Sequence, residues 1–149
     1  MILQTAAGYE IEQTQKLEID ESEIPKAQLL LTKYGPNMVQ RTEPTGFYNC
    51  HGLTFASRRA WVYGNASDIQ HILDDDAYKE VATEFVKAGD TILYFENGVV
   101  VHSGIVVEVA ETLPGAVKVC SKWAQNAEFV HWGHSTPYTY NVKFFRVKR

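Results

Sequence analysis

Cysteine and long apolar runs are scarce in this sequence. Only two cysteines, Cys50 and Cys120, occur in 149 residues, too few for the disulfide framework that holds many small secreted domains together. No apolar run approaches the roughly 18 residues of a membrane-spanning helix. The polar, acidic N-terminal segment lacks the basic and apolar regions of a signal peptide. We therefore expect no membrane-embedded segment and a cytoplasmic location in which both cysteines stay thiols, with export by a non-standard route as the alternative.

Clustered positive charge is also missing. Fourteen lysines and arginines stand against 18 aspartates and glutamates, the net charge is −4, and no three basic residues are consecutive. Nucleic acids and membrane surfaces bind basic patches, so neither is an expected partner. The apolar share of 45% is ordinary for a globular chain, and the length suits one domain spanning 1–149.

The hydrophobic pattern of the first half of the chain is mostly helical. An apolar cluster at 24–33 fits a short helix or a strand. Apolar residues then recur at helical spacing between 50 and 61, which predicts an amphipathic helix that begins near Cys50. A capping-box pattern at Ser67 predicts a second helix through Leu73, and an acidic run predicts a third helix from Ala77.

The pattern changes near residue 90. Four segments are rich in β-branched and aromatic residues, and turn signals at 97–98 and 114–115 separate the first three of them. These predicted strands are 91–95, 99–109, 116–122 and 138–147. Helices followed by strands predict an α+β fold, in which the first long helix packs against one face of an antiparallel sheet.

Cys50 and His102 are the first candidates for chemistry. A thiol at a helix N-terminus experiences the positive end of the helix dipole, which favours the thiolate. His102 interrupts an apolar strand, where a buried imidazole needs a partner. A cysteine can also be a small core residue, and a histidine can be a satisfied core group. Together, however, the two supply a thiolate–imidazolium pair.

Three motifs in this region resemble one family. Tyr-Asn-Cys-His-Gly-Leu at 48–53 resembles the Asp-Cys-Ser-Gly-Leu helix start of NlpC-type papain-like cysteine peptidases, a group with CHAP-like members. Ala-Gly-Asp-Thr-Ile-Leu-Tyr-Phe at 88–95 and His-Ser-Gly-Ile-Val at 102–106 resemble that family's Pro-Gly-Asp-Leu-Val-Phe-Phe and His-Val-Gly-Ile-Tyr segments in order and spacing. The resemblance covers about residues 47–123. It implies a circularly permuted papain-like fold, with Cys50 as the nucleophile and His102 as the base.

Two residues depart from the family pattern. Asn49 replaces the usual acidic residue before the nucleophile, and His51 replaces the usual serine after it. These changes leave open whether a cell-wall peptide is the substrate. We expect Tyr48, Asn49 and His51, which flank the nucleophile, to contact the substrate or the oxyanion.

Three residues are candidates for orienting the His102 imidazole. The family often uses a histidine, which favours His131, and hairpin counting gives Ser121 as the alternative. His134, three residues beyond His131, is a further candidate. His131 and His134 can also be a loop pair that packs beside Trp132. The cysteine and histidine spacings match no common metal motif, so we expect neither a metal site nor a cofactor.

The sequence therefore predicts a cysteine peptidase or amidase that acts on a peptide or small amide substrate. Two alternatives stay open. One is an acyltransferase, or a thioester or lipid amide hydrolase, on the same fold. The other is a binding module without catalysis, since a fold does not determine a function.

Overall fold

The computed structural model describes residues 1–15, 21–113 and 116–148, and the predicted turn at 114–115 lies outside these residues. Its helices are α1 (Lys26–Tyr34), α2 (Cys50–Phe55) and α3 (Ala66–Asp75), with short 3-10 helices at Glu21–Glu23 and Thr83–Phe85. Its strands are β1 (Gln13–Thr14), β2 (Val39–Gln40), β3 (Trp61–Val62), β4 (Tyr78–Val81), β5 (Thr91–Glu96), β6 (Val99–Val109), β7 (Val117–Lys122), β8 (Glu128–Trp132) and β9 (Val142–Val147). No helix in the described part of the chain is both long and apolar enough to cross a membrane.

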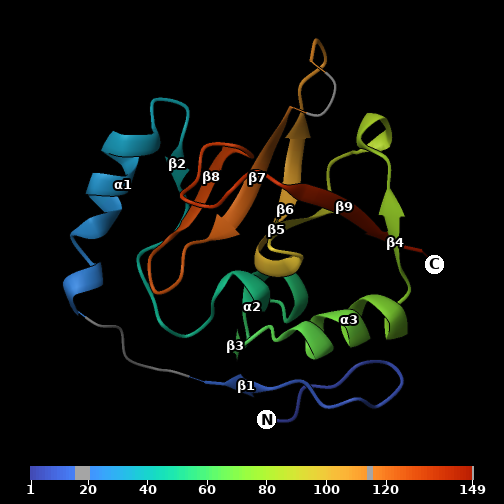
Figure 1. The fold of residues 1–149 in the computed structure, drawn as a ribbon. Helices are drawn as coiled ribbons and strands as arrows, with labels where there is room; N and C mark the ends of the chain where they lie inside the picture. The colour runs from blue at the N-terminus through green and yellow to red at the C-terminus, as the bar shows by residue number, and fades with distance from the viewer. Residues whose placement is uncertain (16–20, 114–115, 149) are drawn as a thin grey trace.

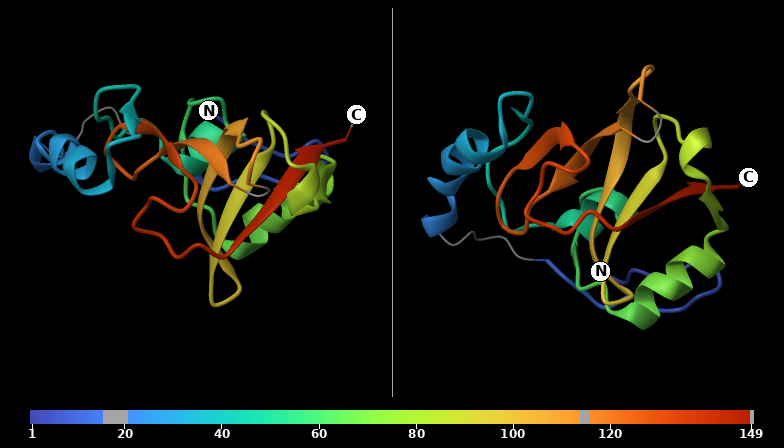
Figure 2. Two further views of the ribbon diagram at one scale, coloured as in Figure 1. Left: turned by 90° about the horizontal axis from the view of Figure 1, so that it is seen from above. Right: turned by 45° about the horizontal axis from the view of Figure 1, so that its top comes forward.

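Seven strands form one antiparallel sheet in the order β2-β8-β7-β6-β5-β9-β4 (Figure 1). The strands β1 and β3 form a separate two-stranded ribbon. Helix α2 contacts β6 and β7, and α3 contacts β6 and β4, whereas α1 lies at the β2 end of the sheet (Figure 2). The predicted α+β class with an antiparallel sheet is confirmed.

The hairpin of β5 and β6 matches the sequence prediction closely. Asn97 and Gly98 have φ angles of 51° and 77°, as the tight turn between two strands requires. Thr91 pairs with Ile105 and Tyr94 with His102, and the register shifts by a bulge after Tyr94. This hairpin places His102 in the middle of the sheet.

The helix that begins at Cys50 is shorter than predicted. It ends at Phe55, because Ser57 and Arg58 adopt φ angles of 50° and 64° and reverse the chain. The chain then crosses the helix so closely that a Cβ atom on Gly52 would lie 1.9 Å from the Ala60 carbonyl oxygen. Ala60 is buried in this return segment, and its helical spacing from Leu53 was therefore misleading.

Two further helix predictions are wrong in detail. Asn65, not Ser67, caps α3, because its side chain accepts a hydrogen bond from the Asp68 amide. The acidic run ends α3 and starts no third helix. Ala77 follows with a φ angle of 61°, and Tyr78–Val81 pairs with β9 as an edge strand.

The sequence analysis does not predict β8 (Glu128–Trp132), the strand that carries His131. This strand pairs with β7, and its polar residues Glu128 and His131 are buried. Their burial hides the alternation that marks a strand. Glu128 accepts hydrogen bonds from Arg58 Nε at 2.5 Å and from the Tyr48 hydroxyl. A single buried carboxylate therefore contacts both segments that flank α2.

Candidate active site

Asn49 sets the position of Cys50 at the start of α2. Its side-chain oxygen accepts hydrogen bonds from the Gly52 amide at 2.9 Å and the Val62 amide at 3.0 Å. Its amide nitrogen donates to the Val62 carbonyl at 2.7 Å. Asn49 is thus the N-cap of α2 and the link between this helix and β3.

His102 is completely buried among aromatic rings. Its imidazole stacks on the Tyr138 ring, with the two ring centroids 4.0 Å apart and the planes 10° from parallel. The Tyr94 ring lies 5.2 Å away. Neither ring nitrogen of His102 has a hydrogen-bond partner among the described residues. A buried imidazole with no structural partner needs a functional explanation.

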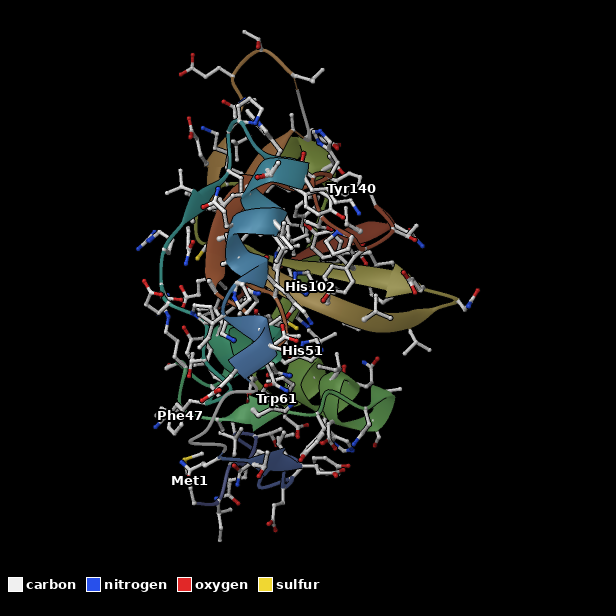
Figure 3. The ribbon with its side chains drawn as sticks, turned by 90° about the vertical axis from the view of Figure 1, so that its left-hand side faces the viewer. Met1, Phe47, His51, Trp61, His102 and Tyr140 are labelled. Carbon is white, nitrogen blue, oxygen red and sulfur yellow. The ribbon has the colours of Figure 1, made fainter. Side chains whose placement is uncertain are left out.

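Cys50 lies beside two imidazoles. Burial alone would raise the pKa of its thiol, but the positive charges of His51 and His102 lower this pKa well below the usual range. The thiolate acts in return on His51, since burial would lower the pKa of His51 and the Cys50 charge raises it. The structure therefore brings the predicted nucleophile and base together and adds a second histidine. The two histidines, His51 and His102, are labelled in Figure 3.

No protein-family model, curated protein or solved structure matches this chain.

His131 and Ser121, the candidates for orienting His102, are bonded to other groups. His131 Nε2 lies 2.7 Å from Ser121 Oγ, and His131 Nδ1 lies 2.7 Å from the Trp132 carbonyl oxygen. The Trp123 indole donates to Ser121 Oγ at 3.0 Å. Burial lowers the pKa of His131 to about 4. No hydrogen bond joins either predicted residue to His102 within the described ranges.

The remaining predicted residues differ in their surroundings. The Tyr48 hydroxyl donates to the Glu128 carboxylate, and Asn49 is occupied by its capping bonds, so both side chains already have structural partners. His134 is exposed, near the Tyr140 ring. Of these four residues, His51 is the one whose charge acts on the Cys50 thiol. Over the residues that the structure covers, no group of three or more His, Cys, Asp or Glu side chains could hold a metal ion.

Lys122 is a charged neighbour that the sequence analysis did not identify. It is 0% exposed at the end of β7, and its ammonium donates to the carbonyls of Thr45 and Ala124, both at 2.6 Å. Burial lowers the pKa of Lys122 to about 8, although the negative charge of Cys50 opposes that shift. No clear signal in the sequence marks Lys122, because β7 also contains another lysine and a serine.

An apolar groove lies next to the buried histidine. Its volume is about 470 Å³, and Leu29, Leu30, Trp123, Pro137 and Tyr138 are among its walls. Because Tyr138 also stacks on His102, one aromatic ring separates the groove from the imidazole. Burial, and to a smaller extent the nearby Cys50 charge, raises the pKa of the Tyr138 hydroxyl to about 12.

Proposed function

We propose that the protein is a cysteine hydrolase that cleaves an amide bond through an acyl-enzyme at Cys50, on a circularly permuted papain-like fold. One observation supports this most directly: a buried thiol with a lowered pKa lies beside an imidazole that has no structural partner. Thiols with a lowered pKa are concentrated at reactive sites, and a buried imidazole without a hydrogen-bond partner needs a functional explanation.

In the first half of the reaction, the Cys50 thiolate attacks the amide carbonyl carbon and forms a tetrahedral intermediate. Backbone N–H groups at the start of α2 hold the developing oxyanion. The intermediate then collapses as the carbon–nitrogen bond breaks. The His102 imidazolium gives its proton to the departing amine and becomes neutral.

In the second half, water attacks the thioester carbon and neutral His102 takes one proton from this water. The carbon–sulfur bond breaks, which releases the carboxylic acid and restores both the thiolate and the His102 imidazolium. His102 therefore carries one proton from water to amine in each cycle.

The groove favours one second candidate, an acyltransferase or a thioester or lipid amide hydrolase. Its apolar walls suit an aliphatic acyl group, and Tyr138 links the groove to His102. The transferase would follow the same first half, and an amine or alcohol would replace water in the second.

Reaction with p-nitrophenyl acetate tests the hydrolase proposal. We expect a stoichiometric burst of nitrophenolate, an acetyl group on the Cys50 peptide and clearance of this group by water. Cys50→Ser should abolish the adduct, and His102→Gln should slow acetylation by about 100-fold, the effect of one general acid–base group. His71→Gln, in the exposed part of α3, is the matched control and should react as the native protein does.

Equal, slow acetylation of Cys50 and Cys120 would contradict the proposal and favour a binding module. If the acetyl group forms normally but leaves faster with added glycine methyl ester than with water alone, the transferase is favoured over the hydrolase.

A further inference from the structure

The structure around His51 is built to hold its imidazole in one orientation. His51 Nδ1 lies 2.8 Å from Ser103 Oγ, and Ser103 comes directly after His102 in β6. Ser103 Oγ in turn donates to Thr54 Oγ1 at 2.9 Å. Thr54 belongs to α2, as His51 does, so the two hydroxyls join this helix to the central strand.

Gly64 provides the space for the other side of the ring. It has a φ angle of 72°, and a Cβ atom on this residue would lie 2.3 Å from His51 Cδ2 and 2.6 Å from Nε2. No L-residue would fit there without moving the ring. Glycine therefore serves both the backbone conformation and the position of His51.

The direction of these hydrogen bonds determines where the ring carries its proton. Because Ser103 uses its own hydrogen toward Thr54, its oxygen accepts from His51, which requires a proton on Nδ1. The neutral ring then has its lone pair on Nε2. An oriented imidazole with Nδ1–H bonded to a fixed acceptor is the arrangement in which a histidine accepts a proton from a nucleophile.

The two histidines beside Cys50 thus differ in their hydrogen bonding. His51 has an orienting hydroxyl pair, whereas His102 has no partner for either nitrogen among the described residues. The other titratable groups around the thiolate are Lys122 from β7 and Tyr138 from the segment before β9. His131 faces His102 from β8.

We propose that His51, oriented by Ser103 and Thr54, is the resident cation that keeps Cys50 ionised, while His102 is the group that exchanges protons with the substrate. This inference rests on the proposed function. The thiol proton moves from Cys50 Sγ to the His51 ring, which leaves a thiolate and an imidazolium and changes no other bond. His51 then stays charged through the cycle, and the proton given to the leaving amine comes from His102 alone.

The pH dependence of Cys50 alkylation by iodoacetamide tests this division of roles. The rate is followed by peptide mass from pH 4 to 10, with Cys120 as the internal reference thiol. An ordinary thiol has a midpoint near pH 8.5, and we expect the midpoint of Cys50 in the native protein to lie well below this value. His51→Gln should raise the midpoint by about one pH unit or more. At a pH below the native midpoint, this shift lowers the alkylation rate about tenfold.

Ser103 supplies a test that leaves His51 in place. Ser103→Ala removes the acceptor and should raise the midpoint in the same direction, whereas Ser103→Thr keeps the hydroxyl and should restore the native value. His71→Gln is again the control. Circular dichroism and thermal melting show whether each variant is folded. If His51→Gln does not fold, the comparison of Ser103→Ala with Ser103→Thr tests the role of His51.

The outcomes separate this inference from the proposed function. If Cys50 keeps its low midpoint in His51→Gln and Ser103→Ala but loses it in His102→Gln, the role of His51 is refuted and the hydrolase proposal stands. If native Cys50 has the midpoint of an ordinary thiol, both proposals are refuted.

Discussion

Gly64 leaves room for the His51 imidazole because it has no side chain. Its φ angle of 72° favours glycine, and the space where a Cβ would lie is filled by the His51 ring. No pattern in the sequence alone places this residue beside His51. Its contact with His51 is made across a chain reversal, which local patterns do not describe.

Gly64→Ala should therefore have two effects. The strained backbone should lower the free energy of unfolding by about 1–3 kcal/mol, and the displaced His51 ring should raise the midpoint of Cys50 alkylation. Gly98→Ala is the matched control, because Gly98 has a φ angle of 77° but nothing within 4 Å of the added Cβ. It should lose stability and keep the alkylation profile. A Gly64→Ala protein with an unchanged profile would contradict the account of the ring's position.

The N-cap residue of α2 also joins this helix to a strand. Asn49 accepts from one amide of its own helix and bonds both polar backbone groups of Val62 in β3. Asn49→Ala should therefore leave a helix end uncapped and a buried strand residue unpaired. We expect a loss of roughly 2–4 kcal/mol in the free energy of unfolding, measured by urea titration.

Asn65→Ala provides the comparison, because Asn65 caps α3 through one hydrogen bond to the Asp68 amide. It should cost about 1 kcal/mol. Equal losses from the two substitutions would show that the bonds from Asn49 to Val62 contribute little.

The elements that the sequence predicted well are those in which local rules agree. The β5–β6 hairpin has alternating apolar residues and a turn of Asn97 and Gly98, and its strands were predicted almost to the residue. The predictions at α2 and β8 failed because contacts with distant residues override the local pattern. Arg58 turns out of the expected helix toward Glu128, which lies 70 positions later in the sequence.

The candidate site was predictable to a similar degree. Cys50 could be found because it lies at a predicted helix start, and His102 because it interrupts an apolar strand. The structure brings the two residues together. The role of His51 depends on Ser103, and the environment of His131 depends on Ser121 and Trp132. Those pairings follow from strand register and from a helix–strand contact, neither of which a single sequence determines.

For the whole molecule, stability should fall as the pH decreases from 6.5 to 4. Burial lowers the pKa of His131 to about 4, so between these values the unfolded chain binds a proton that the folded chain excludes. At still lower pH, Glu128 adds to the loss. Burial would raise its pKa, but hydrogen bonds from Arg58 and Tyr48 lower it below the ordinary value.

Urea unfolding at pH 7, 5.5 and 4.5 measures this dependence. His131→Gln should make the free energy of unfolding change less steeply with pH over this interval. A slope that does not depend on residue 131 would mean that the buried histidine makes no contribution to acid sensitivity.

The Glu128 carboxylate has a mechanical consequence for the molecule. It accepts hydrogen bonds from Tyr48, in the segment before α2, and from Arg58, in the segment after it. The segments before and after α2 are therefore both hydrogen-bonded to the same residue of β8. Any movement of the β7–β8 hairpin would carry α2 with it as one body, so the sulfur cannot be repositioned independently of that part of the sheet.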